Sequence, residues 1–233
     1  MPRNSTVPKN CKLLVLLTCA LFLSVTAIGQ TKKDSLIVFV GEKLSVRYFP
    51  EEESRWIVDS ILINETDTVV SRHLEPSMDS RYQAKYRILE LVHGAYQADT
   101  IEFTAYVHEG GPAFAQFNHV LLFLSYSNGK LYHEKYQYFD VYKAKNGRWA
   151  SPYPAADYNH PYRDSISVKP EKISFTEGLK FSLKLPRNFY MQRSYPPPFY
   201  KIQEEYAAPV FGNYVEDLFK LKMETTLKAR GIY

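Results

Sequence analysis

Cysteine is almost absent from this chain: its 233 residues include two, Cys11 and Cys19, and both lie within the first 29 residues. The remaining chain can form neither a disulfide nor a cysteine-ligated metal site. It has no G-x-S-x-G segment, and its Gly-Gly pair, Gly110-Gly111, is followed by proline and not by a helix. These absences argue against a serine hydrolase with a nucleophile elbow and against a phosphate-binding loop.

Net charge is also nearly absent once the leader is set aside. The whole chain has 29 basic and 25 acidic residues, and losing Arg3, Lys9 and Lys12 with the leader leaves 26 − 25 = +1. Such a chain has no bulk electrostatic attraction for nucleic acid or for an anionic membrane. We therefore expect no nucleic-acid partner.

The first 29 residues predict a secretory signal peptide. A basic start precedes the apolar run Leu13–Ile28, and Ala27 and Gly29 are small residues at the −3 and −1 positions of a cleavage site before Gln30. We expect the mature protein to be periplasmic or secreted and to keep no stable membrane anchor.

Two alternatives would keep the chain at a membrane. The leader could remain as an anchor helix, but an apolar run of about 16 residues is short for a hydrocarbon core about 30 Å thick. Cys19 could carry a lipid, as in a bacterial lipoprotein signal. Against this, Thr18 is larger than the residue usually found before such a cysteine, and the apolar run continues past it.

The stretch His119–Tyr142 predicts a β-hairpin. Two runs rich in β-branched, aromatic and leucine residues flank Asn128-Gly129, a pair that tolerates the positive φ angles of a type I′ turn. The first run contains Val120–Phe123 without polar alternation, which indicates a strand buried on both faces at the centre of a sheet.

Three further runs predict strands that complete a β-barrel over residues 30–150. Leu36–Tyr48 is apolar up to Gly41, where a bulge is expected, and then alternates, with Leu44 and Val46 facing one way. The two remaining runs alternate apolar and polar residues and are Tyr82–Val92 and Thr100–His108.

Two smaller elements are expected within this region. An inserted hairpin over about residues 50–80 consists of Arg55–Ile63 and Thr68–Leu74 on either side of a polar turn. Ala113–Asn118 is short enough to form one helical turn before the fourth barrel strand.

Residues 151–233 predict an extension that ends in an α-helix. Its expected elements are an extended connector at Ser151–Tyr162, a hairpin at Ile173–Leu185, an extended run at Tyr195–Tyr200 and a helix at Asn213–Arg230. For the helix we expect Asn213 and Glu216 as a capping pair and Gly231 just past the end. Its expected apolar stripe is Val215, Leu218, Phe219 and Met223.

This strand pattern resembles the Greek-key barrel called the OB-fold and, more locally, the netrin-like module. The segments that carry the resemblance are Val38–Glu42, Ala84–Val92 closing on Gly94, Asp99–Ile101, and Phe117 before Val120–Leu124. The module occurs in tissue inhibitors of metalloproteinases and related extracellular proteins. Over about residues 36–145, the resemblance implies a mainly β, five-stranded OB-type barrel in an exported bacterial protein.

The resemblance carries over no functional residue. Tissue inhibitors of metalloproteinases ligate the enzyme's zinc through an amino-terminal cysteine, and the mature chain expected here begins near Gln30 without any cysteine.

Histidines could suggest a metal site, especially His108, His119 and His133. In the register set by the two-residue turn, His119 faces Tyr138 and His133 faces Leu124, with the two imidazoles on opposite faces of the sheet. We therefore expect no metal ligand, no cofactor and partly exposed strand histidines.

Paired carboxylates could suggest acid–base catalysis. Glu134 and Asp140 lie on one face of the second hairpin arm, but six residues of strand separate them by about 20 Å, too far for glycosidase chemistry. We expect no catalytic residue.

The residues best suited to binding lie on the second arm of the hairpin. Its even-numbered positions mix tyrosines with acids, a combination that partner-binding surfaces favour because tyrosine is apolar in body and polar at its tip. They are Tyr132, Glu134, Tyr136, Tyr138, Asp140 and Tyr142. The alternative is that residues 151–233 cover this face internally.

Two functions follow as hypotheses. The first is an exported, non-enzymatic β-barrel protein that binds a protein or glycan in the envelope or outside the cell. The second is an exported hydrolase or metal-binding protein whose site is assembled from dispersed residues. Activity screening with and without a chelator separates them.

Cleavage before Gln30 is the first testable prediction. Mass spectrometry of the protein isolated from its native host is expected to give a chain that starts at Gln30. An intact Met1, or a lipid on Cys19, would contradict it.

Overall fold

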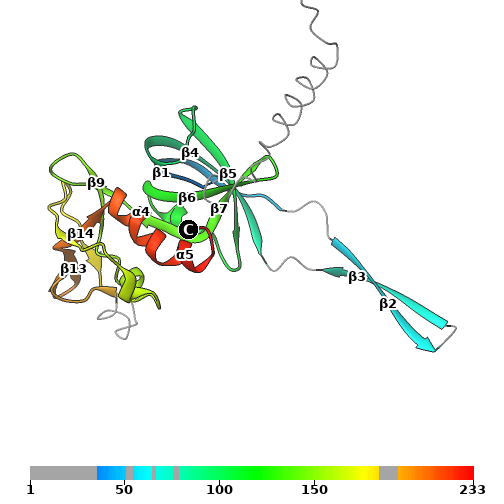
Figure 1. The fold of residues 1–233 in the computed structure, drawn as a ribbon. Helices are drawn as coiled ribbons and strands as arrows, with labels where there is room; N and C mark the ends of the chain where they lie inside the picture. Colours follow the sequence, from blue (N-terminus) through cyan, green and yellow to red (C-terminus); the bar gives the residue numbers. More distant parts are fainter. Residues whose placement is uncertain (1–35, 51–54, 65–66, 76–78, 184–193) are drawn as a thin grey trace, which may run out of the picture. The chain divides into compact units, whose positions relative to one another are not determined.

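The computed structural model describes residues 36–50, 55–64, 67–75, 79–183 and 194–233 (Figure 1), and within 55–75 it describes the side chains of residues 58 and 70–72. The predicted signal peptide, its cleavage site and both cysteines lie outside these ranges. The described chain is mainly β, as predicted. None of the helices within these ranges is long and apolar enough to cross a membrane.

Five strands close into a barrel, as predicted. They follow one another around it in the order β1, β4, β5, β7 and β6, and β6 returns to β1. Neighbouring strands are antiparallel except β5 and β7, which pair in parallel at Thr104 and Tyr132. The bounds are β1 Leu36–Tyr48, β4 Ser80–His93, β5 Thr100–Val107, β6 His119–Ser127 and β7 Lys130–Asp140.

The β6–β7 hairpin has the predicted turn. Asn128 and Gly129 both have positive φ, 49° and 77°, so the turn can follow the twist of the two strands. β6 pairs with β1 on one side and with β7 on the other, and Val120–Leu124 are 0% exposed. The central strand buried on both faces is confirmed.

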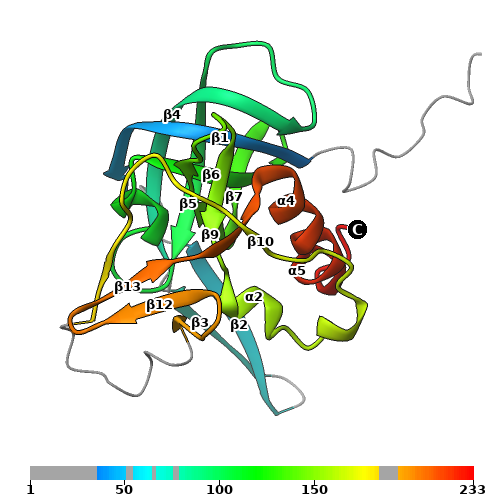
Figure 2. The same cartoon turned by 90° about the vertical axis from the view of Figure 1, so that its left-hand side faces the viewer.

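Two hydrophobic clusters cover the two faces of β6. Its side chains Val120, Leu122 and Leu124 point into the barrel. The odd-numbered Leu121 and Phe123 pack outside the barrel with Leu218 and Phe219 of the C-terminal helices, which lie beside these strands in Figures 1 and 2. The C-terminal extension therefore completes the hydrophobic core.

The pairing of β1 with β4 slips at Gly41, as predicted. Val40 pairs with Glu90 and Gly41 pairs with Ile88, so Leu89 of β4 is the extra residue. The register shift thus lies at the predicted position, but the bulged strand is β4 and not β1, and a bulge bends the strand that contains the extra residue.

The predicted orientation of Leu44 is wrong. Lys43 and Ser45 pair with consecutive residues of β4, so Leu44 is an extra residue between them and its side chain is 43% exposed. Val46 packs against the barrel interior. A slip of one residue reverses the alternation of a strand, which the sequence pattern did not reveal.

β7 carries a larger irregularity. Leu124 pairs with His133 as predicted, but Leu122 pairs with Tyr138, so β7 advances five residues while β6 advances two. The three extra residues reverse the alternation: odd-numbered positions point into the barrel before the irregularity and even-numbered ones after it. The predicted pairing of His119 with Tyr138 is therefore wrong.

Both small elements predicted within the barrel region are present. β2 (Arg55–Asn64) and β3 (Asp67–Glu75) form an antiparallel two-stranded sheet of their own. Val58 and Val70 of this hairpin are 56% and 57% exposed. Ala113–Gln116 forms a single 3₁₀ turn, η2, before β6.

Residues 142–214 contain two small sheets, and strands β12 and β13 run side by side in Figure 2. The four-stranded sheet has the order β10 (Glu171–Lys172), β14 (Phe211–Tyr214), β9 (Trp149–Pro152) and β8 (Tyr142–Lys143). The three-stranded sheet has the order β11 (Phe181–Ser182), β13 (Tyr206–Pro209) and β12 (Tyr200–Gln203). Two short helices, α2 (Ala155–Tyr158) and η3 (Arg163–Ser165), lie between β9 and β10 in the chain.

Three predictions about this region are wrong. Ser151–Tyr162 is not an extended connector, because it includes the end of β9 and helix α2. Ile173–Leu185 does not form a hairpin over its described part, because Phe175 bridges Ala144 and β11 pairs with β13. Tyr195–Tyr200 is not extended, because the Phe199 amide donates to the Pro196 carbonyl at 3.1 Å and closes a turn.

The C-terminal helix buries the predicted stripe. Val215, Leu218 and Phe219 are buried and Met223 packs against the same cluster. The helix is in two pieces, α4 (Val215–Glu224) and α5 (Thr226–Ala229). The break falls at Thr225, with φ −121° and ψ −100°, and Gly231 follows α5 with φ 65°.

The predicted helix cap is wrong. Asn213 lies in β14 and is fully buried, and its side-chain amide donates to the Tyr158 hydroxyl at 3.0 Å and to the Lys169 carbonyl at 3.3 Å. Glu216 pairs with Arg148 at 3.0 Å. The local pattern predicted that Asn213 and Glu216 form a capping box, but each side chain instead contacts residues far along the chain.

Gly41→Val is expected to destabilise the fold by about 1–3 kcal/mol. A Cβ at this position would lie 2.7 Å from Phe39 Cε2 and 3.0 Å from Tyr86 Cδ1, both in buried rings. Chemical denaturation measures the change. Gly178→Val is the matched control, because nothing lies within 4 Å of a Cβ there; equal losses in both variants would contradict the packing role of Gly41.

Candidate functional site

The six residues of the predicted binding face lie before, within and after the irregularity in β7. Upstream, the Tyr132 ring stacks on Tyr106 of β5 at 6.3 Å. Glu134 accepts a hydrogen bond from the Ser125 hydroxyl and pairs with Arg230 at 2.9 Å. The upstream residues thus contact neighbouring strands and the C-terminal segment.

Tyr136 lies within the irregularity and is 57% exposed, with φ of 67°. A positive φ is rare for a bulky residue and is held here by the neighbouring residues. Lys135 pairs with both oxygens of Asp79 at 2.7 and 2.8 Å, and its carbonyl accepts from Arg230 Nη2 at 2.7 Å. Of the six predicted site residues, Tyr136 is the one that is exposed.

Downstream, Tyr138, Asp140 and Tyr142 come together. The Tyr138 ring lies 6.4 Å from Phe114 and 6.1 Å from Phe117, at the edge of the barrel interior. Asp140 is partly exposed and accepts a hydrogen bond from the Tyr142 hydroxyl. Loss of hydration through burial raises the pKa of Asp140, and the bond from Tyr142 offsets only part of that rise.

Two tyrosines of the C-terminal extension complete this group. Burial raises the pKa of Tyr195 and of Tyr200, and the charge of Asp140 adds to each rise. Their rings are 5.1 Å apart, and Tyr195 also stacks on Phe181 at 5.6 Å. Burial and then the Asp140 charge likewise raise the pKa of Tyr138 and Tyr142. We call Tyr138, Tyr142, Tyr195 and Tyr200 the tyrosine collar of Asp140.

A cleft of about 470 Å³ adjoins the collar and shares Tyr142 with it. Its walls come from the link before β6 and the first residue of β6, from Val141 between β7 and β8, from β8 and β9, and from the 176–177 loop. The lining residues are Gln116, Phe117, Asn118, His119, Val141, Tyr142, Lys143, Trp149, Thr176 and Glu177. This volume lies in the range of small-ligand sites.

The aromatic side chains of the cleft are already engaged. His119 lies 4.9 Å from the Trp149 ring, and Lys143 Nζ lies 4.1 Å from the same ring. Lys143 also donates to the Gly147 carbonyl at 2.8 Å. A ligand in the cleft would therefore meet ring edges and polar groups, and not an open aromatic face.

The three histidines considered for a metal site lie apart. His133 is packed between Phe103 and Phe114, its Nε2 lies 2.8 Å from the Gln137 carbonyl, and burial lowers its pKa to about 4. His119 packs on Trp149, and His108 lies 3.7 Å from Asp79. Within the part of the chain that the structure describes, no three His, Cys, Asp or Glu side chains are placed to hold a metal ion.

The sequence indicated half of this site. Tyr138, Asp140 and Tyr142 were among the predicted binding residues, whereas Tyr195 and Tyr200 were considered only as part of a run that could cover the face. The available sequence signal was the high tyrosine content of residues 138–142 and 195–200. That these two segments act on the same carboxylate, Asp140, follows only from the tertiary structure.

Comparison of the chain with protein-family models, with curated proteins and with solved structures gives no match. The netrin-like resemblance therefore stays a prediction.

Asp140→Asn is expected to raise the melting temperature at pH 7. The unfolded chain ionises this carboxyl near pH 3.8, whereas the folded chain keeps the proton to higher pH. The free energy of unfolding therefore falls as pH rises through that window, because the unfolded chain ionises Asp140 more readily. The neutral amide avoids this loss.

At pH 3, where Asp140 is protonated in both states, the substitution is expected to change the melting temperature little. Asp164→Asn serves as the control at both pH values, because the Asp164 side chain is 97% exposed. A lower melting temperature of Asp140→Asn at pH 7 would show that the ionised carboxylate stabilises the fold.

Proposed function

We propose that this protein is an exported, non-enzymatic β-barrel protein that binds a segment of a partner protein in the envelope or outside the cell. The observation that carries the proposal is the cleft of about 470 Å³ lined by Tyr142, Trp149 and Glu177. The partly exposed Asp140 carboxylate accepts a hydrogen bond from the Tyr142 hydroxyl. Half-buried tyrosines beside a charged group are typical of protein-binding sites.

We further propose an OB-type barrel for the scaffold. The strand order β1, β4, β5, β7, β6 with a parallel contact between β5 and β7 supports it, because that is the order of a five-stranded Greek-key barrel of this type. The β2–β3 hairpin then occupies the link between the first two barrel strands. The netrin-like resemblance supports the same assignment and an extracytoplasmic location.

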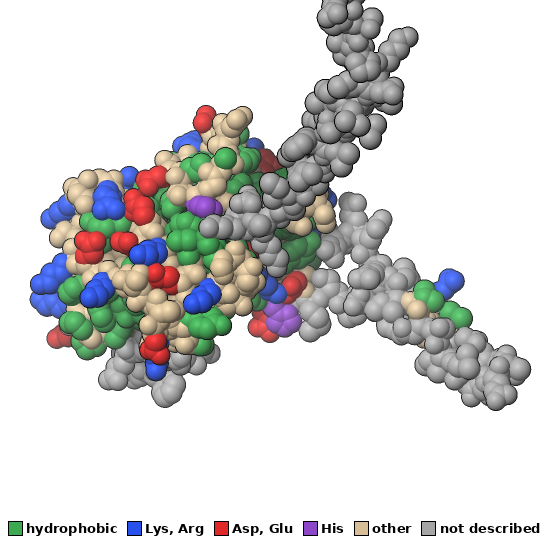
Figure 3. All heavy atoms as spheres, in the orientation of Figure 1, with side chains coloured by type: hydrophobic (Ala, Val, Ile, Leu, Met, Phe, Trp, Pro, Cys, Tyr) green, Lys and Arg blue, Asp and Glu red, His purple; other side chains and the backbone are tan. Residues whose placement is uncertain are grey.

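OB-type barrels often bind single-stranded nucleic acid over their second and third strands. Here Lys85 of β4 pairs with Glu102 of β5 at 2.7 Å, and Tyr106 stacks on Tyr132. Acidic and basic side chains are interspersed on the face shown in Figure 3. These features support a protein partner over a polyanion.

A protein segment is favoured over a glycan by the state of the aromatic rings. Sugar rings stack on an open aromatic face, whereas His119 and Lys143 both pack on Trp149, and the Tyr142 ring meets Phe175 at 82°. The free positions of the cleft are ring edges, amides and carboxylates, which suit peptide groups and side chains.

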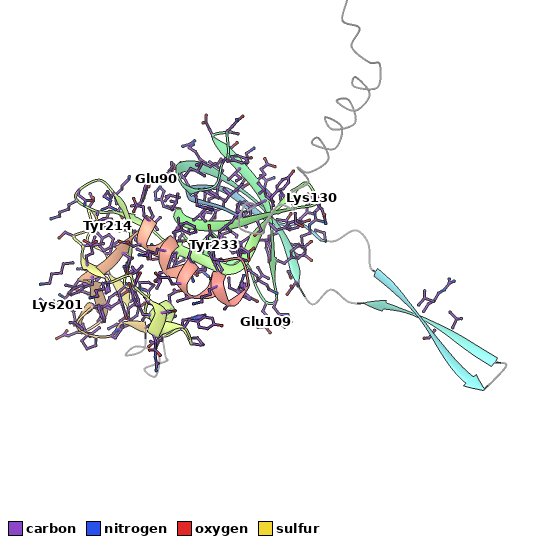
Figure 4. The ribbon with its side chains drawn as sticks, viewed as in Figure 1. Glu90, Glu109, Lys130, Lys201, Tyr214 and Tyr233 are labelled. Carbon is purple, nitrogen blue, oxygen red and sulfur yellow. The ribbon has the colours of Figure 1, made fainter. Side chains whose placement is uncertain are left out.

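Site-specific photocrosslinking tests the proposal. A photoreactive amino acid replaces Asn118, an exposed residue of the cleft, in the full chain expressed in its native host. The expected result is a crosslinked species that contains peptides of a second protein, and that disappears when Tyr142→Ala is added. The same photoreactive residue at Lys201, exposed on β12 (Figure 4), is the control and is expected to give no such species.

A crosslinked product without foreign peptides that a glycosidase removes would replace the protein partner by a glycan. Equal crosslinking from Asn118 and Lys201, or no loss with Tyr142→Ala, would contradict binding in the cleft. An activity screen of the same protein with and without a chelator addresses the alternative of a hydrolase or metal-binding protein.

A further inference from the structure

A second pocket, of about 440 Å³, lies at the end of the β6–β7 hairpin opposite to the cleft. Its walls come from β4, β5 and the hairpin tip, where Lys130 lies (Figure 4). Phe103 and Leu131, which pack into the barrel interior, form its apolar side. Among the described residues, the pocket and the cleft have no lining residue in common. The pocket is therefore a separate candidate site.

Arg81 of β4 brings an unpaired guanidinium to this pocket. Within the described part of the chain its Nε is buried without a hydrogen-bond acceptor, whereas Arg87, Arg148 and Arg230 each pair with a glutamate at 2.7 to 3.0 Å. The Arg81 Cζ lies 4.8 Å from the centre of the Phe49 ring. Stacking on a ring holds the guanidinium in place and leaves the N–H groups at its edge for a planar anion.

The other charges around the pocket also favour an anion. Lys130 is exposed, and none of the described ion pairs includes it. Glu102 is the acidic residue that lines the pocket, and it pairs with Lys85 at 2.7 Å. The side chains of Gln83 and Thr104 add neutral hydrogen-bond donors. An anion would therefore meet two cations, and the one negative charge nearby is already neutralised.

An open strand edge beside the pocket favours an anion that a peptide carries. β5 pairs with β4 from Thr100 to Val107, but among the described pairings it meets β7 at Thr104 alone. The stretch 100–103 thus has a strand partner on one side, and Glu102 and Phe103 of this stretch line the pocket. Such an edge can hydrogen-bond an extended segment while the pocket takes one of its side chains.

We propose that this pocket binds a carboxylate that an extended protein segment carries as an aspartate or glutamate side chain. The carboxylate would accept hydrogen bonds from the Arg81 guanidinium, and the Lys130 ammonium would add a second positive charge at the rim. The backbone of the segment would pair with the open edge of β5. This site goes beyond the proposed binding in the cleft and does not depend on it.

Two blocked tripeptides that differ in one charge test the proposal. N-acetyl-Ala-Glu-Ala amide and N-acetyl-Ala-Gln-Ala amide are each titrated into the protein purified from its native host and followed by NMR. The Arg81 Nε–Hε signal is the readout, because burial of Nε slows its exchange with water. The glutamate peptide is expected to shift this signal and to bind at least about tenfold more tightly than the glutamine peptide. The Nε–Hε signal of Arg87, which pairs with Glu42, is the internal reference and is expected to stay in place.

Substitutions place the effect in the pocket. Arg81→Gln is expected to weaken binding of the glutamate peptide at least about tenfold, and Lys130→Gln is expected to weaken it less. Because Lys130 is exposed, its variant keeps the test valid if Arg81→Gln alters folding. Lys201→Gln, which removes an exposed positive charge on β12, is the matched control and is expected to change nothing.

Equal affinity for the two peptides, an unmoved Arg81 signal, or unchanged affinity in both Arg81→Gln and Lys130→Gln would overturn the carboxylate site. Glucuronate and methyl phosphate are titrated in parallel to identify the carrier of the charge. Weaker binding of both than of the glutamate peptide would support a peptide carrier. Binding of either as tight as that of the peptide would overturn that assignment in favour of an acidic sugar or a phosphate.

Discussion

Strand β6 must be covered on both of its faces, and the rest of the described structure depends on this requirement. Its even-numbered side chains fill the barrel, where they meet residues of β1, β4 and β5. Its odd-numbered side chains, Leu121 and Phe123, would be exposed on a bare barrel and instead pack against Leu218 and Phe219 of α4. Since each buried side chain of this size contributes about 1.5–3 kcal/mol, the C-terminal extension is part of the core and not an appendage to it.

The irregularity in β7 links this core to the candidate site. Three extra residues let the strand reverse its alternation between His133 and Tyr138, so Phe139 can join the outer cluster. The adjacent Asp140 is thereby left beside the tyrosine collar. Arg230 holds the irregularity from the C-terminal end of the chain, through Glu134 and the Lys135 carbonyl. The element that closes the outer core thus also fixes the strand from which the site is built.

Burial disfavours the ionised form of Asp140 in the folded chain. Its environment of tyrosines disfavours the ionised form, and the Tyr142 hydroxyl compensates only in part. A neutral side chain would fit such surroundings with less loss of hydration energy.

The sequence by itself determined the elements whose causes are local. Asn128-Gly129 predicted the central hairpin, and the apolar run of β6 predicted burial on both faces. Gly41 marked the point where the pairing of β1 with β4 shifts. These features follow from turn geometry and side-chain alternation over neighbouring residues. Only the tertiary structure decided where β7 reverses its alternation, why Asn213 is a buried partner of Tyr158 and not a helix cap, and which tyrosines surround Asp140. Each of these features depends on contacts between segments that are far apart in the sequence. Such contacts can override the local preference of a segment, and the local sequence pattern does not show them.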